Sequence, residues 1–471
     1  MFIPRKGVKV KLYGNTPDTN QYKDCGVGAI SDLLPLSLQI STTVGFTDIV
    51  SSLKYLGYVS GLTLQAIPYN FYLSHKNNEV SKMFTAHLKR LNKLTGKKTT
   101  VIAHSMGNLN ALYNLDRMKP EMRSKLVFNY MSIAPPFLGA TKVPKLLLSG
   151  NDDFITLGGY FGFHFSASVK TISNQASVFE LFAKDFYRLY EEEPWFEHVK
   201  KRIEYEKKFP NIPYYNSGID FWPRKGATCY DNTLSDFREL CEINLLDTKN
   251  FDIITIGEER FKLRDMEALY NERPLTYNTV PLFRKVVKDD IAYMNPGVPV
   301  VLLFMSTHKT PIAYVFDENF NHYIENNQYP PTVDIIYGNG DETVPTYSAV
   351  IPGLRWAYQF ENEPDSGRYF PVKFVELCSK MNRHNTIYDR EYSSREKEIL
   401  ENSYIGIDCE CTKQEHVTSY DKCTHSNMLS DKYLIKTPER NRVRRNRGAQ
   451  SRTWSRRASL WPFAAWVSSH S

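Results

Sequence analysis

The sequence predicts an α/β fold, with a mostly parallel sheet covered by helices. Residues 62–133 alternate strand-like and helix-like segments in the order β-α-β-α-β. Within them, residues 99–103 are apolar and β-branched, which suits a strand buried on both faces. Three further strand-like runs follow at 298–304, 332–337 and 372–377. Such alternation indicates parallel strands joined by right-handed helical crossovers.

The elements follow from local patterns along the chain. Alternation predicts a short strand, and amphipathic spacing predicts a helix that Gly57 ends. His87 falls on the apolar face of a later helix, so we expect it to be a packed helix residue. The predicted elements are strand 8–12, helix 46–58, strand 62–67, helix 79–95, strand 99–103, a helix from Gly107, strand 126–133, strand 298–304, a hairpin beside it at 312–316 with Tyr323, strands 332–337 and 372–377, and helix 395–404.

A long insertion separates the two sets of strands. After about residue 150, strand signals thin out, and aromatic and charged residues mix with Asn- and Pro-rich stretches. An insertion between core strands can form a cap over an active site; a second independent domain is the alternative. The predicted division is a first part of the core at 1–150, a cap at 151–295, a second part of the core at 296–404, and a tail at 405–471 that is polar, then rich in Arg and Trp, and expected to be disordered.

Charge and hydropathy exclude several function classes. The chain has 471 residues and a formal net charge of +7, but eight of its 59 basic residues are arginines in the acid-free stretch 440–471. The remaining 51 basic residues face 52 acidic ones. The body is therefore nearly neutral and shows no nucleic-acid-binding face; a tail that binds nucleic acid is a minor alternative. No apolar run is long enough to span a bilayer, and no signal peptide is visible, so the sequence leaves the localisation unknown.

The seven cysteines are odd in number and scattered, which does not indicate a disulfide scaffold. One cluster of possible zinc ligands stands near the C-terminus, but its spacing matches none of the common zinc modules. Its members are Cys409, Cys411, His416, Cys423 and His425. We therefore predict no metal site and no cofactor.

A tight strand-to-helix turn at Ser105 is the strongest chemical signal. The strand at 99–103 runs through His104-Ser105-Met106-Gly107 into the next helix. This pattern is typical of a nucleophile elbow, which presents a serine above the sheet and points the next backbone N–H at the oxyanion. Ser105 is then the nucleophile and Met106 N–H an oxyanion donor. The alternative is an ordinary β-turn-α in which Ser105 is an N-cap.

An acid and a histidine must follow the serine, each after a strand. Asp341 follows strand 332–337, and two flanking glycines allow the sharp turn there. The neighbouring Glu342 is a weaker alternative, and Asp334 lies within the strand. His384 directly follows strand 372–377, unlike the later histidines. We expect Ser105 to attack an ester carbonyl, His384 to remove its proton and Asp341 to fix the imidazole.

Several ordered blocks resemble the lecithin:cholesterol acyltransferase family, within the α/β-hydrolase superfamily. That family also includes phospholipid:diacylglycerol acyltransferases and the lysosomal phospholipase A. The resemblance covers about residues 7–400, and the His384 loop is its last block. The other blocks are Gly-Tyr-Val-Ser-Gly-Leu-Thr-Leu-Gln-Ala-Ile-Pro-Tyr-Asn-Phe-Tyr from Gly57, Ala-His-Ser-Met-Gly-Asn at 103–108, Ser-Ile-Ala-Pro-Pro-Phe-Leu-Gly-Ala-Thr-Lys at 132–142, Leu-Leu-Leu-Ser-Gly-Asn at 146–151, Tyr-Asp-Asn-Thr-Leu-Ser-Asp-Phe-Arg-Glu-Leu at 230–240 and Tyr-Gly-Asn-Gly-Asp-Glu-Thr-Val-Pro at 337–345. The resemblance places Ser105, Asp341 and His384 at the triad positions.

The chain departs from the family pattern in two places. Where the family has Pro-Tyr-Asp-Trp-Arg, this sequence has Pro-Tyr-Asn-Phe-Tyr at 68–72. Residues 8–12 match a segment well inside the family's domain. The first core strand, the loop that gives the second oxyanion donor and a small membrane-binding lid are therefore expected to be absent. The strand beside that gap would then keep an unpaired edge.

The resemblance implies a serine O-acyltransferase. It would move an acyl group from a glycerophospholipid, through an acyl-serine, to a sterol, diacylglycerol or another alcohol. The alternatives are a phospholipase that uses water as acceptor and an inactive lipid-binding member. The implied partners are phospholipid and lipid-alcohol substrates and a membrane or lipoprotein surface, and the family suggests the secretory pathway, the lysosome or a membrane surface.

Overall fold

The computed structural model describes two sheets and the helices packed on them. It covers residues 25–27, 46–70, 73–76, 78–150, 175–197, 199–201, 204, 248–272, 280–287, 291–305, 308–363 and 365–377, and the strands 404–407 and 463–467. The strand expected at 8–12 and residues 395–403 of the last expected helix lie outside these residues.

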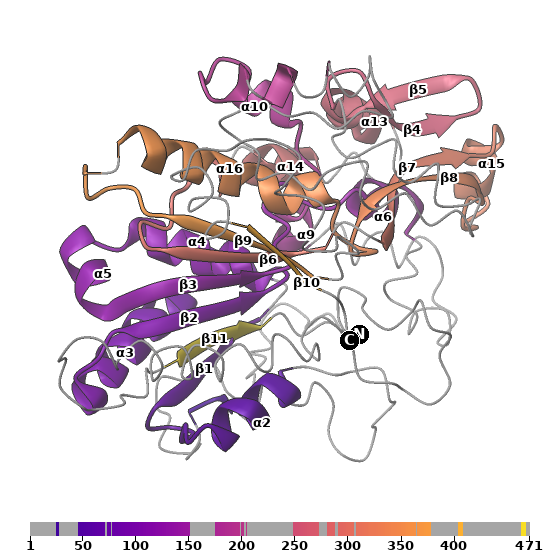
Figure 1. Ribbon diagram of the computed structural model, residues 1–471. Helices are drawn as coiled ribbons and strands as arrows, with labels where there is room; N and C mark the ends of the chain where they lie inside the picture. The colour runs from indigo at the N-terminus through magenta and orange to yellow at the C-terminus, as the bar shows by residue number, and fades with distance from the viewer. Residues whose placement is uncertain are drawn as a thin grey trace.

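The main sheet has seven strands in the order β1-β11-β2-β3-β6-β9-β10 (Figure 1). Every neighbouring pair in it is parallel. The predicted α/β fold with a mostly parallel sheet is therefore confirmed. The strands are β1 (Leu64–Pro68), β2 (Thr99–His104), β3 (Val127–Ile133), β6 (Val300–Phe304), β9 (Val372–Leu377), β10 (Tyr404–Ile407) and β11 (Phe463–Val467).

Alternate residues of the central strands enter two different cores. On β2, Val101 and Ala103 pack in the cluster that holds the helices of one face, whereas Ile102 packs with the helix of the other face. This two-residue period is what a strand buried on both sides requires. The first face carries α3 (Asn78–Thr95), α4 (Gly107–Arg117), α5 (Pro120–Leu126) and α16 (Thr346–Asn362), and the second carries α2 (Thr47–Tyr55). None of the helices described is long and apolar enough to cross a membrane.

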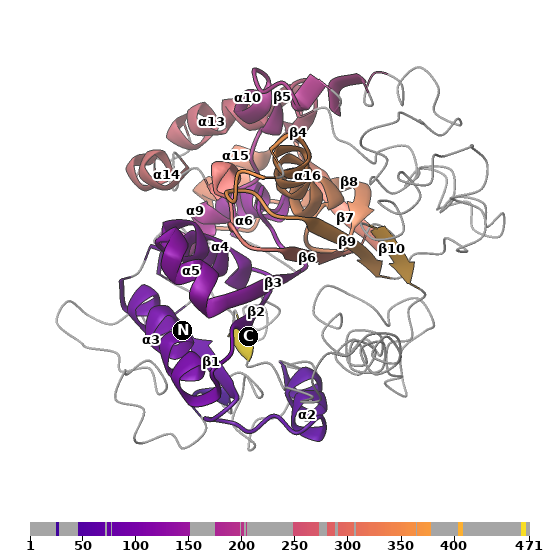
Figure 2. The same cartoon turned by 60° about the vertical axis from the view of Figure 1, so that its left-hand side comes forward.

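A second, four-stranded sheet has the order β5-β4-β7-β8. Both cartoon views show it to one side of the main sheet (Figures 1 and 2). Its strands are β4 (Asp252–Ile256), β5 (Glu259–Lys262), β7 (His308–Phe316) and β8 (Thr332–Gly340). Its apolar core includes residues of α6 (Lys142–Ser149), α9 (Ala176–Glu180), α13 (Met266–Glu272), α14 (Val280–Val287) and α15 (Phe320–Glu325). The remaining short helices are α10 (Phe186–Tyr190), η4 (Leu263–Asp265) and η6 (Ile291–Tyr293).

The second sheet corrects two expectations about the later strands. The hairpin expected beside 298–304 does not form there, because β6 already has β3 on one side and β9 on the other. β7 pairs instead with β4 and, antiparallel, with β8, so 332–337 does not join the core sheet either. Tyr323 lies on α15 rather than in a hairpin.

The strand β11 occupies the position between β1 and β2. It is parallel to both, with Phe463 opposite Leu64 of β1 and Thr100 of β2. The edge that we expect to stay unpaired therefore has a partner, which comes from the far end of the chain. Most of the tail at 405–471 lies outside the described residues, but the two strands in it differ from the expected disorder.

Breaking β11 tests whether it completes the sheet. An interior strand uses its backbone N–H groups in the ladder, so Ala465→Pro removes a donor from the centre of the sheet. We expect Ala465→Pro, and deletion of 463–471, to lower the thermal unfolding midpoint, measured by circular dichroism. Ala449→Pro, in the same tail but outside the strand, should not. Equal midpoints for all variants would show that the sheet does not depend on β11.

His87 generates a pH-dependent prediction. It is buried on α3, and burial, with a smaller effect of the Arg90 charge, lowers its pKa from 6.5 to about 4. Between these values the unfolded chain binds the proton and the folded chain does not. The free energy of unfolding therefore falls as the pH drops from 6.5 towards 4, by about 3 kcal/mol in all. Urea denaturation at pH 7 and pH 4.5 measures this fall.

His87→Leu should remove that part of the pH dependence, since the variant has no proton to bind in either state. His322→Gln is the control, because His322 is exposed on α15. The same pH dependence in both variants would contradict the prediction.

Candidate active site

Ser105 stands at a strained strand-to-helix turn. All six residues of β2 are buried, and only Ser105 and Met106 separate β2 from α4. Ser105 has φ +50°, in the left-handed region that costs a non-glycine residue about 1–2 kcal/mol. Its side chain lies where the strand ends, and the residue is 6% exposed. This backbone geometry is that of a nucleophile elbow.

Backbone hydrogen bonds tie the turn to the neighbouring strand. Ser105 N–H donates to the carbonyl of Ile133, the last residue of β3, at 3.0 Å. Ala134, which also has a positive φ, donates to Leu303 of β6 at 2.9 Å. Hydrogen bonds thus link the end of β2 to the end of β3, and the end of β3 to the end of β6. Met106 directly precedes the first residue of α4, so its N–H belongs to the helix N-terminal groups that lack an intrahelical acceptor.

Asp341 lies in a tight turn at the end of β8 and is 2% exposed. Its Oδ1 accepts hydrogen bonds from Thr343 N–H at 3.0 Å and Val344 N–H at 2.7 Å. These two bonds fix the orientation of the carboxylate. The neighbouring Glu342 has φ +79° and is half-buried, with its N–H donated to Thr310 Oγ1 at 2.9 Å.

The turn of Asp341 belongs to the second sheet, but its continuation is anchored at the edge of the main sheet. Thr346 Oγ1 donates to the carbonyl of Met305, just after β6, at 3.3 Å. Ser348 Oγ donates to the Gly139 carbonyl at 2.6 Å and accepts Leu138 N–H at 3.1 Å, in the loop after β3. Parallel strands end at one edge, where sites in open α/β sheets form. The residues that follow Asp341 are therefore anchored at the edge at which β3 and β6 end.

The triad roles of Ser105, Asp341 and His384 stay predictions. His384 lies outside the described residues, but β9, the strand that precedes it, is parallel to β6 and ends at the same edge. The possible zinc ligands from Cys409 to His425 also lie outside the described part. Within that part, no group of three or more potential ligands is placed to hold a metal ion. Asp334 lies exposed on β8, within the strand as expected.

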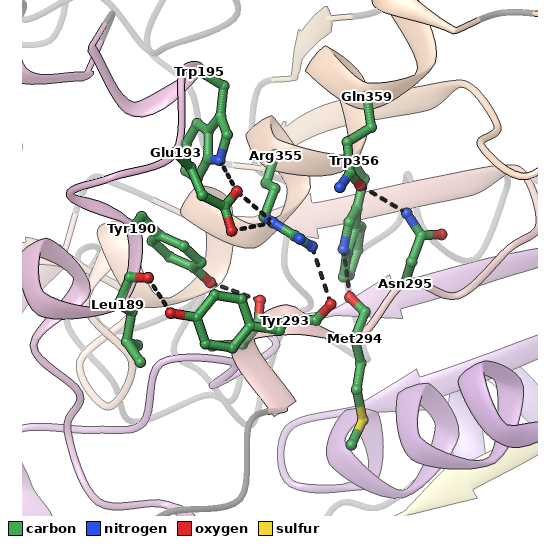
Figure 3. A network of polar contacts seen from close by, with 11 residues as sticks. Leu189, Tyr190, Glu193, Trp195, Tyr293, Met294, Asn295, Arg355, Trp356 and Gln359 are labelled. Carbon is green, nitrogen blue, oxygen red and sulfur yellow. Dashed lines mark hydrogen bonds and ion pairs between the residues drawn. The ribbon is translucent and has the colours of Figure 1, made fainter.

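Part of the insertion is fastened to α16, the helix that follows Asp341 (Figure 3). Arg355 Nε lies 2.8 Å from Glu193 Oε2, and Arg355 Nη1 donates to the Tyr293 carbonyl at 3.0 Å. Trp356 Nε1 donates to the Met294 carbonyl at 2.8 Å. Trp195 Nε1 also donates to Glu193. Residues of the expected cap therefore pack against α16, the helix that follows the turn of Asp341.

The sequence did not reveal two features of the site. One is the assignment of Asp341 to a second sheet. The other is a buried hydrogen-bond network around Asn108, whose partners Tyr130 and Ser132 lie on β3. Its sequence signal is weak: a polar residue three positions after Ser105, on the helix face that meets the sheet.

The turn at Asp341 has no room for a side chain at Gly340. A Cβ at this position would lie well inside van der Waals contact of Thr310 Oγ1 and of the Val344 carbonyl. Gly340→Ala should therefore lower the free energy of unfolding by about 1–3 kcal/mol, as overpacking does. Chemical denaturation measures the change. Gly340→Ala/Thr310→Ala should recover only part of it, because the Val344 carbonyl is backbone and stays. An unchanged unfolding midpoint in Gly340→Ala would contradict this account.

The chain is similar in sequence to known acyltransferases and phospholipases. Phosphatidylcholine-sterol acyltransferase of Gallus gallus is 23% identical over 312 residues, covering 66% of this chain and 58% of that protein. Lysosomal phospholipase A and acyltransferase of Homo sapiens is 30% identical over 117 residues, covering 24% and 28%. The matches span little more than half of the first relative's length and less of the second's.

One solved structure has a weak similarity to the chain. The crystal structure of the Tle4-Tli4 complex aligns with 61% of this chain and 59% of that chain, at 17% identity and a TM-score of 0.29. The family described as lecithin:cholesterol acyltransferase matches residues 7–377, well over half of the sequence. The chain therefore belongs to the lecithin:cholesterol acyltransferase family.

Proposed function

We propose that this chain is a serine O-acyltransferase that takes a fatty acyl group from a glycerophospholipid. Ser105 is the nucleophile, His384 the general base and acid, and Asp341 the residue that orients the imidazole. The observation that carries the proposal is the left-handed backbone of Ser105 at the end of a buried parallel strand. Family membership supports the lipid ester as substrate.

In the first half-reaction, His384 takes the proton from Ser105 Oγ as this oxygen attacks the ester carbonyl. The negative charge that develops on the carbonyl oxygen is stabilised by Met106 N–H. The bond between the acyl carbon and the glycerol oxygen then breaks, and His384 returns the proton to that oxygen. The products are an acyl-Ser105 and a lysophospholipid. Neither redox chemistry nor a cofactor is needed.

In the second half-reaction, an alcohol attacks the acyl-serine. His384 takes the alcohol's proton, the new ester leaves, and the proton returns to Ser105 Oγ. A sterol fits the name of the first relative, and water as acceptor fits the phospholipase in the name of the second. Diacylglycerol is a further candidate acceptor. Because phospholipid and lipid alcohol reside in membranes or lipoproteins, the chain meets its substrates at such a surface.

Active-site labelling tests the triad. A fluorophosphonate reacts only with an activated serine, so the wild-type chain should be labelled and Ser105→Ala should not. Asp341→Asn should slow the labelling by up to about 10⁴-fold through the wrong imidazole tautomer. Ser124→Ala, on an exposed position of α5, should label at the wild-type rate. Labelling that persists in Ser105→Ala would overturn the proposal, and an unlabelled wild type would favour an inactive lipid-binding member.

The acceptor is tested with the same variants on vesicles of radiolabelled phosphatidylcholine containing cholesterol or diacylglycerol. Label in cholesteryl ester or triacylglycerol supports the transferase. Label only in free fatty acid shows that water is the acceptor and replaces the transferase with a phospholipase. Either product should be lost in Ser105→Ala.

A further inference from the structure

Asn108 lies behind Ser105 in the first turn of α4, and its side chain is fully buried. Its Nδ2 donates to the Ser105 carbonyl at 2.9 Å and to the Ile133 carbonyl at 2.8 Å. Its Oδ1 accepts from Tyr130 Oη at 2.7 Å and Ser132 Oγ at 2.8 Å. All four hydrogen-bonding positions of the amide are therefore used, which is the requirement for a buried polar group.

The partners determine which way the amide points. Two backbone carbonyls can only accept, so the nitrogen must face them, and the two hydroxyls of β3 must donate to the oxygen. Burial raises the pKa of the Tyr130 phenol well above its ordinary value, which keeps the hydroxyl protonated. Tyr130 and Ser132 thus act as fixed donors, and the orientation of Asn108 has no alternative.

Both backbone polar groups of Ser105 converge on this amide. The Ser105 carbonyl accepts from Asn108 Nδ2 and also from Asn108 N–H at 3.0 Å. Ser105 N–H donates to the Ile133 carbonyl, which is the second acceptor of Asn108 Nδ2. The strained φ of Ser105 is thereby held from both sides.

The same contact determines the direction of the oxyanion donor. The Ser105 carbonyl and Met106 N–H belong to one planar trans peptide unit, so they point in opposite directions and turn together. Holding the carbonyl towards Asn108 therefore aims Met106 N–H in the opposite direction. A donor must be placed to within a few tenths of an ångström to stabilise a transition-state oxyanion.

We propose that Asn108 is a positioning residue, which holds the peptide after Ser105 so that the nucleophile and the Met106 oxyanion donor keep their reactive geometry. This rests on the proposed role of Ser105. Asn108 itself contacts no reacting atom. Its loss should lower kcat and leave KM nearly unchanged, because it removes an alignment that matters in the transition state and no contact with bound substrate.

The matched control is Asn114, another of the buried asparagines on α4. Its Nδ2 donates to the Asn110 carbonyl of the same helix. Asn108→Ala and Asn114→Ala each remove a buried amide from this helix, so both should lower stability. Only Asn108→Ala should slow fluorophosphonate labelling of Ser105 and phosphatidylcholine turnover, by about 100-fold, as expected for loss of alignment or of one oxyanion donor.

The donors on β3 give a milder test. Tyr130→Phe and Ser132→Ala leave Nδ2 and its two acceptors in place and each remove one of the two donors to Oδ1, so each should reduce kcat by less than Asn108→Ala. Added to Asn108→Ala, they should reduce it little further, because the three residues act as one unit. These variants also decide the question if Asn108→Ala fails to fold.

Amide hydrogen exchange tests the positioning role without relying on catalytic activity, so its outcome is independent of the proposed function. In a peptide covering residues 103–109, Asn108→Ala should speed exchange of the Ser105 amide, and Asn114→Ala should not. That result supports the positioning role even if the wild type proves unlabelled, in which case only the enzymatic proposal fails. Wild-type exchange and labelling in a folded Asn108→Ala variant, or equal losses in both asparagine variants, would overturn it.

Discussion

The left-handed backbone of Ser105 is the constraint around which this structure is arranged. A serine at φ +50° pays a conformational penalty that the surrounding contacts must offset. The contacts are specific: β3 offers the Ile133 carbonyl to Ser105 N–H, and Asn108 holds the carbonyl on the other side. Because β2 is buried along its whole length, the strand before the turn cannot shift to relieve the strain. The side chain therefore stays at the edge of the sheet.

A second constraint concerns how the acid reaches that edge. The chain leaves the main sheet after β6, builds β7, α15 and β8 in the second sheet, and returns through Asp341. A detour of this length positions a carboxylate only if its return is anchored. Thr346 and Ser348 provide the anchors, since they bind backbone carbonyls after β6 and in the loop after β3. The segment that follows Asp341 is thus hydrogen-bonded to the ends of β3 and β6, and β3 also binds the turn at Ser105.

Local sequence patterns predicted the elements near the elbow well. The buried β2, the helix that follows it and the strand β9 lie where periodicity put them, because each is specified by residues close in sequence. The strand-end patterns predicted Ser105, Asp341 and His384 as site residues and the family blocks agreed, but their catalytic roles remain proposals. The Asn108 network was not predicted, since three residues of ordinary type make it and they meet only after folding.

Strand pairing was the part that the sequence could not give. The strand β8 cannot pair with β6, because β3 and β9 already occupy both edges of β6. The pairing of β11 with β1 and β2 joins segments that lie hundreds of residues apart. Neither has a local signal, because any apolar strand of suitable length satisfies the same backbone hydrogen bonds.

The contacts of α16 connect the acid to the expected cap. The helix begins just after the turn of Asp341, and further along it Arg355 and Trp356 bind Glu193 and Met294 of the insertion (Figure 3). Glu193 also accepts a hydrogen bond from the Trp195 indole. One carboxylate therefore binds an aromatic side chain, Trp195, and a cationic one, Arg355. Moving this part of the insertion as a body would break these bonds or drag α16 with it. Since α16 also carries the anchors at Thr346 and Ser348, such movement would act on the acid's turn. A movement of these residues of the insertion that leaves the turn of Asp341 in place would therefore have to break the contacts with Arg355 and Trp356.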